Sequence, residues 1–153
     1  MHTRAFRNRH GRGQRGIVMP QSIPRFQSRS DRFDALVTSA YAPLAHNFAE
    51  ELAHMDIAVD VIPRMRLVAS NTILPDEVCA DGPVPLGRVI PAGVDAAGQP
   101  TRPRIVIFRR PIEARAATDE EREALIRRVL VSLVATYLNV APQDIDPAFD
   151  LER

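Results

Sequence analysis

Lysine and tryptophan are absent from the 153-residue sequence, and cysteine occurs only once, at Cys79. A single cysteine excludes an internal disulfide and a four-cysteine zinc site, and it favours a reducing compartment. No apolar run approaches the roughly 18 residues that a membrane-spanning helix needs. The N-terminus also lacks the apolar stretch of a secretory signal. The sequence therefore predicts a cytoplasmic protein without a membrane segment.

Positive charge is concentrated at the N-terminus. Residues 1–30 contain seven arginines and no acid, whereas residues 31–153 contain 13 arginines and 19 acids. The first segment is too poor in apolar residues to pack, which predicts a disordered, Arg/Gly-rich tail. Three interpretations stay open: an arm that contacts RNA or DNA phosphates, a solvated tail, or a segment that is never made because translation starts at Met19. Few aromatic side chains are available for stacking on bases, which disfavours nucleic acid as a partner.

Residues 31–150 have the length of one domain with a single core. A helix is expected to start at Ser30 or Asp31, where both residue types suit a helix N-terminus. Pro43 interrupts the apolar spacing of this helix, and we expect it to open a second helix that runs to about Met55. Apolar patterns predict strands at 57–62, 86–90 and 105–108, the last of them central, with an exposed loop at 91–103.

The clearest local signal lies near the C-terminus. Thr118 followed by Glu121 forms a capping-box pattern, and a wide apolar stripe continues from there to about Leu138. Asn139 readily takes the left-handed conformation that ends a helix. These features predict one long helix as the spine of the core, then a further helical turn around 141–147. The fold class expected is α+β, with a small mixed sheet packed against N-terminal helices and this long helix.

Four segments in this order resemble the minimal zincin-like metallopeptidases, a bacterial family. They are IAVDVIP at 57–63, PLGRV at 85–89, IVIFRRPIE at 105–113 and RRVLV at 127–131. The third segment is the most specific, because it is similar to the family's strand-and-turn pattern. The resemblance covers about residues 31–150. It implies a zincin-like fold and, in active members, a zinc ion held by His-Glu-x-x-His on the long helix.

That motif does not occur in this sequence. The resemblance places Ser132 at the first ligand, Leu133 at the general base and Thr136 at the second ligand. The glycine that usually follows becomes Asn139, and the acidic third ligand becomes Pro142. Zinc prefers thiolate, imidazole or carboxylate ligands, and leucine cannot move a proton. The sequence therefore predicts no zinc, no catalytic residue and no peptidase activity, with hydroxyls that bond back to the preceding helical turn.

Other candidate chemistry is weaker. His46, Glu50 and His54 are spaced by four residues on the expected second helix, where a metal site is conceivable but a polar solvent-facing side is favoured. Cys79 lies among acidic residues, which would raise the pKa of its thiol and lower its nucleophilicity. Arg109 and Arg110 could hold an acidic partner, although the proline that follows favours their reaching solvent.

The leading hypothesis is an inactive zincin-like domain that binds a protein or peptide segment by adding it as a strand to the sheet. One alternative is an active metallopeptidase with a non-standard site built on His46, His54 or acids. Another is a nucleic-acid-associated accessory protein that acts through the basic tail. The sequence does not identify the substrate, the partner or the oligomeric state.

Overall fold

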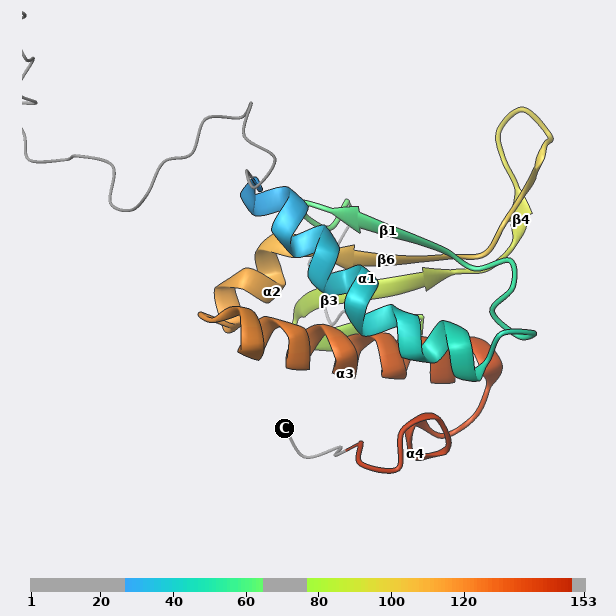
Figure 1. Ribbon diagram of the computed structural model, residues 1–153. Helices are drawn as coiled ribbons and strands as arrows, with labels where there is room; N and C mark the ends of the chain where they lie inside the picture. Colours follow the sequence, from blue (N-terminus) through green and yellow to red (C-terminus); the bar gives the residue numbers. More distant parts are fainter. Residues whose placement is uncertain (1–26, 65–76, 150–153) are drawn as a thin grey trace, which may run out of the picture.

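A four-stranded mixed sheet lies at the centre of the computed structural model, which describes residues 27–64 and 77–149 (Figure 1). Its strands are β1 (Asp56–Asp60), β2 (Val78–Asp81), β3 (Val84–Ile90) and β6 (Arg104–Phe108), in the order β1-β6-β3-β2. β1 runs parallel to β6, and the other pairs are antiparallel. The expected mixed sheet and α+β class are confirmed, and β6 is internal as predicted.

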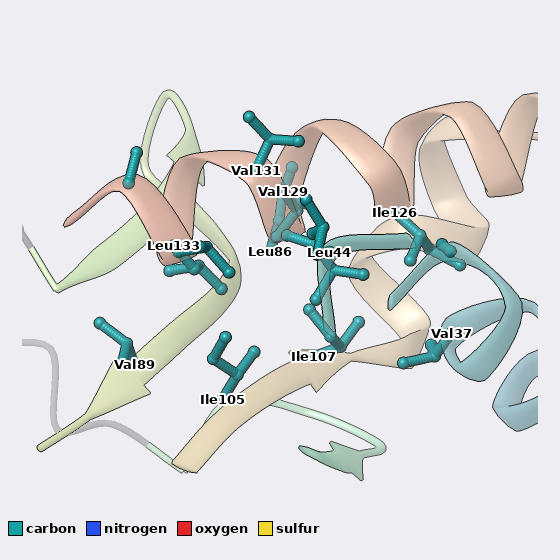
Figure 2. Close-up of a cluster of buried hydrophobic side chains, with 14 of the residues drawn as sticks. Val37, Leu44, Leu86, Val89, Ile105, Ile107, Ile126, Val129, Val131 and Leu133 are labelled. Atoms are coloured by element: carbon teal, nitrogen blue, oxygen red, sulfur yellow. The ribbon is translucent and has the colours of Figure 1, made fainter. Parts of the chain in front are cut away.

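Helices cover one face of this sheet. They are α1 (Arg29–Asn47), α2 (Arg109–Arg115) and α3 (Asp119–Leu138), and the short α4 (Pro142–Ile145) packs on α3 on the side away from the sheet (Figure 1). Side chains from β3 and β6 point toward α1 and α3, and together they form the core (Figure 2). Within the parts of the chain that the structure describes, no helix is both long and apolar enough to cross a membrane.

β6 is apolar from Ile105 to Phe108 because both of its faces are covered there, whereas Arg104 at its start is exposed. Ile105 and Ile107 belong to the core beneath the helices and have no exposed surface. Val106 and Phe108 alternate with them on the opposite face and are also buried. A strand buried on both faces has no need for polar residues at alternate positions, which accounts for the continuous run in the sequence.

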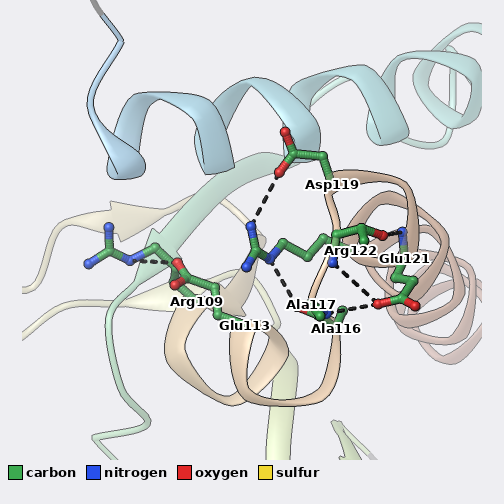
Figure 3. A network of polar contacts seen from close by, with 8 residues as sticks. Arg109, Glu113, Ala116, Ala117, Asp119, Glu121 and Arg122 are labelled. Atoms are coloured by element: carbon green, nitrogen blue, oxygen red, sulfur yellow. Dashed lines mark hydrogen bonds and ion pairs between the residues drawn. The ribbon is translucent and has the colours of Figure 1, made fainter. Parts of the chain in front are cut away.

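The ends of α3 follow the sequence pattern closely. The Glu121 amide donates to Thr118 Oγ1 at 3.1 Å, and Glu121 Oε2 accepts from the Thr118 amide at 3.2 Å, completing the capping box (Figure 3). Arg122 strengthens the same turn through an ion pair with Asp119 at 3.2 Å. At the other end Asn139 takes the left-handed conformation with φ of 55°. The predicted long helix is therefore confirmed at both ends.

Two predictions about the N-terminal helices were wrong. Pro43 lies inside α1, which ends at Asn47, and residues 48–54 form turns instead of a second helix. Pro43 removes the amide that the Ser39 carbonyl would accept from, but both residues are exposed, so water can serve that carbonyl. The N-cap is Ser28, not Ser30, and its hydroxyl accepts from the Asp31 amide at 3.0 Å.

Four further elements were not expected. β2 lies in a part of the sequence for which no strand was predicted. The expected loop at 91–103 contains a hairpin of β4 (Gly93–Val94) and β5 (Pro100–Thr101), which projects beyond the sheet (Figure 1). α2 begins at Arg109, and Pro111 lies in its first turn. Amides in a first turn have no acceptor within the helix, so a proline there costs no hydrogen bond. Residues 1–26 of the tail predicted at 1–30 lie outside the described residues, and so does Asp76, one of the acids near Cys79. The last two residues of that predicted tail, 29 and 30, belong to α1.

Candidate functional site

The three positions where the resemblance places the zinc motif lie on α3, but they face different surroundings. Leu133 is 1% exposed and belongs to the core. Ser132 is half-buried beside β2, and Thr136 is exposed. Thr136 Oγ1 donates to the Ser132 carbonyl at 3.0 Å, which confirms the expected bond to the preceding turn for this residue. The base position has therefore become part of the hydrophobic core.

The remaining two motif positions have structural roles. The Asn139 amide bonds to carbonyl oxygens of the last turn of α3, so this residue ends the helix. Pro142 is the first residue of α4, where a proline suits the start of a helical turn. Zinc requires thiolate, imidazole or carboxylate ligands, and these positions offer only hydroxyls, a buried leucine and a proline. The residues present at these positions thus do not fit the metal that the zincin fold implies.

No alternative metal centre forms among residues 27–64 and 77–149, since no three His, Cys, Asp or Glu side chains there are placed to hold one ion. His46 lies near the end of α1, whereas Glu50 and His54 lie in the turns that follow it, and all three are exposed. The expected helical spacing of four residues is therefore wrong, because the helix that would have aligned them ends at Asn47.

A pocket of about 680 Å³ lies between β2 and α3, and we call it the β2 pocket. Its polar lining comes from Cys79, Asp81, Arg115, Glu121, Arg128 and Ser132. The C-terminal segment after α4 contributes Phe149, which also packs against the core. The pocket therefore combines one edge of the sheet with the face of α3 that carries Ser132.

The C-terminal segment is held against α3 by two kinds of contact. Ile145 is buried in the core, and Asp146 forms an ion pair with Arg127 at 3.1 Å. Val131 lies beneath this segment and is 1% exposed. These contacts fix the position from which Phe149 reaches the β2 pocket.

Charges within the β2 pocket are only partly paired. Arg115 Nε lies 2.6 Å from Asp81 Oδ2. Glu121 is committed to the amides of Ala117 and Thr118 at the start of α3. Arg128 Nε is buried, and no described residue accepts a hydrogen bond from it. Arg128 is therefore the cation in this pocket whose charge has no described partner.

Cys79 lies in the same pocket, on β2. Burial raises the pKa of its thiol, while a hydrogen bond from Ser132 and the positive charge of Arg128 act in the opposite direction without cancelling it. The direction of the pKa shift agrees with the sequence prediction, but the main cause is desolvation and not the neighbouring acids. A thiol with a raised pKa is a poor nucleophile at neutral pH.

We expect Cys79 to react slowly with iodoacetamide at pH 7.5, because its folded-state pKa lies above that of a free thiol. The rate for the folded protein should rise only at pH values above the free-thiol pKa of about 8.5, and in denaturant it should match that of a free cysteine. Since the folded-state pKa is raised, ionisation of the thiol should also reduce the free energy of unfolding as the pH rises above the unfolded-state value. Mass spectrometry of labelling against pH measures this, and fast labelling of the folded protein at pH 6.5 would contradict it.

Several pocket residues were missed from the sequence. Arg128 could have been found, because it precedes Ser132 by four residues and so shares its helix face. Asp81, Arg115 and Phe149 come from separate segments, and no local pattern predicts that they meet. The expectation for Arg109 was also incomplete. Its Nε lies 3.5 Å from Glu113 across one turn of α2, so it is paired within the fold (Figure 3).

Comparison with known proteins agrees with this architecture. A family model described as zincin-like metallopeptidase matches residues 52–149, which is more than half of the chain. No curated protein matches the sequence. The matched region contains the whole four-stranded sheet and the long helix α3. The chain therefore belongs to the zincin-like metallopeptidase family.

Proposed function

We propose that this domain has lost zinc and peptidase activity, and that it binds an extended segment of another protein along β2. The loss of activity is supported by the chemistry of the motif positions. Leu133 is packed in the core, and the hydroxyls at Ser132 and Thr136 are poor zinc ligands. A binding function can persist without the metal, because strand addition relies on backbone hydrogen bonds and side-chain pockets.

The observation that carries the binding proposal is the outer edge of β2. β2 pairs with β3 on one side only, and no described strand lies on its other side. Val78, Cys79 and Ala80 present no charge against an added strand, and Asp81 at the end of β2 is paired with Arg115. The opposite edge, β1, carries two acids: Asp56, which is paired with Arg102, and Asp60. Acids on an edge strand oppose pairing with another chain, and β2 carries one acid where β1 carries two.

The pairing of β2 with β3 shows which backbone groups of β2 could form hydrogen bonds with an added strand. The Val89 amide donates to the Glu77 carbonyl at 2.9 Å, so the Glu77 backbone faces β3. Because antiparallel strands alternate in the direction of their amides and carbonyls, the backbone of Val78 faces away from β3. A segment added at this edge would take its hydrogen bonds from Val78 and would run past the β2 pocket.

Replacing Val78 with proline should abolish this binding, because proline has no amide to donate to the added strand. Proline is tolerated on an edge strand when the lost amide faces solvent, so the fold should survive. The measurement is binding of the full chain to an immobilised library of ten-residue peptides, acetylated and amidated at their ends.

Val78→Ala is the matched control, since it keeps the amide and removes only part of the side chain. Wild type and Val78→Ala should select the same peptides, and Val78→Pro should select none while keeping the circular dichroism spectrum of wild type. Peptide binding that is unchanged in a folded Val78→Pro variant would refute strand addition at β2.

A further inference from the structure

We infer that the β2 pocket selects a glutamate side chain in the bound segment, and that Arg128 recognises its carboxylate. This inference rests on the proposed function, because it assumes that an extended segment lies along β2. It specifies the side chain of one residue in the bound segment, whereas the open edge of β2 would accept segments of many sequences.

Arg128 is placed to reach a strand added at this edge. It lies one helical turn before Ser132 on α3, and both line the β2 pocket. Arg128 and Cys79 of β2 line the same pocket, so the Arg128 side chain lies near this strand. Its Nε is buried without a described acceptor. A charged group without a partner in a partly buried site costs free energy, and a ligand carboxylate that meets the part of Arg128 lining the pocket would reduce that cost.

The other charges around the pocket are already engaged. Arg115 is paired with Asp81, and Arg127 is paired with Asp146 outside the pocket. The Glu121 carboxylate accepts hydrogen bonds from the amides of Ala117 and Thr118 at the start of α3, and it forms no ion pair with Arg128. An incoming acid would therefore meet one cation without displacing an existing ion pair.

The pocket fits a carboxylate with an apolar stem better than a phosphate. Leu125, Val129 and Phe149 provide apolar walls beside Arg128, which has no ion-pair partner among the described residues. Arginine binds a planar carboxylate with two parallel hydrogen bonds. A phosphate dianion would add two negative charges near Asp81 and Glu121, with only Arg128 to offset them. Glutamate supplies one negative charge and methylene groups that can lie against Phe149.

The test uses the same library of acetylated, amidated ten-residue peptides with the full chain. Wild type should enrich glutamate at one position of the selected peptides. Changing that glutamate to glutamine should weaken binding about tenfold or more, as expected for a hydrogen bond to a charged group. In Arg128→Met the enrichment should vanish, and the same peptide change should have almost no effect.

Arg104→Met is the matched control, because Arg104 is exposed at the start of β6 and lies outside the β2 pocket. It should keep the glutamate preference. If Arg128→Met does not fold, Arg128→Gln provides a second variant, which keeps a long polar side chain without the charge and should also lose the glutamate preference. A glutamine change that weakens wild type and folded Arg128→Met equally would overturn the role of Arg128.

Two further arms separate other sources of negative charge. Peptides with a free C-terminus and peptides with phosphoserine are tested beside the amidated set, and a preference for either over glutamate would overturn the inference. If wild type selects peptides in a Val78-dependent way without any glutamate preference, the inference fails while the proposed function stands. If wild type selects no peptides at all, both fail together.

Discussion

Replacing Leu133 with glutamate is expected to reduce the free energy of unfolding by about 4 kcal/mol or more. The substitution restores the residue that active zincins are expected to carry as general base. Here the side chain is 1% exposed and packed in the core, next to Gly87 of β3. A carboxyl group at this position would lose its water without gaining a partner, and the leucine packing would also be lost. Urea unfolding followed by circular dichroism measures the effect.

Leu133→Met is the matched control, because it keeps a similar apolar volume and should cost less than about 1.5 kcal/mol. A Leu133→Glu variant as stable as wild type would show that the side chain can reach solvent. A side chain at this position could then reach a substrate, which would contradict the burial of Leu133 in the core.

Replacing Gly87 with valine is expected to reduce the free energy of unfolding by about 3 kcal/mol. A Cβ atom at Gly87 would lie 3.0 Å from Leu133 Cδ1, Val129 Cγ1 and the Val106 carbonyl oxygen. The two side chains can shift slightly, but the carbonyl belongs to the central strand and is fixed by its neighbours. The absence of a side chain at Gly87 thus allows α3 to lie close against β3. Thermal and urea unfolding measure the loss.

Gly93→Val provides the control, because the nearest atom to a Cβ there is Thr101 Oγ1 at 3.9 Å. This change should have little effect on stability. A folded Gly87→Val variant should also show a changed environment for Cys79, since Cys79 lies opposite Gly87 in the ladder. Equal stability of the Gly87→Val and Gly93→Val variants would contradict the close contact of α3 with β3.

Local signals predicted the parts of the fold that depend on one segment alone. The capping box at Thr118 and the left-handed Asn139 determine the ends of α3, and both act within a few residues. The apolar run at 105–108 likewise predicted a central strand. Pro43 was misread because the penalty for a proline in a helix depends on whether the freed carbonyl is buried. Its exposure at this position is a tertiary property.

The β2 pocket could be predicted only in part. The sequence placed Ser132 on the long helix and identified Cys79, but it gave no sign that the two face each other across β2 and α3. β2 itself is four residues long and contains no strong strand formers beyond Val78. β2 is a strand because it pairs with β3, and this stabilisation cannot be read from its own four residues. The ion pair of Arg115 with Asp81 joins residues far apart in the chain, and no spacing rule anticipates it.

Metal content of the full-length protein tests most directly whether this zincin-like domain works without zinc. The protein is purified without chelator, its zinc is measured by inductively coupled plasma mass spectrometry, and its thermal unfolding is followed with and without EDTA. We expect no stoichiometric zinc and the same unfolding temperature in both conditions, because Ser132, Leu133 and Thr136 offer no suitable ligand. One zinc per chain, lost to EDTA together with cleavage of an unfolded protein substrate, would contradict this conclusion.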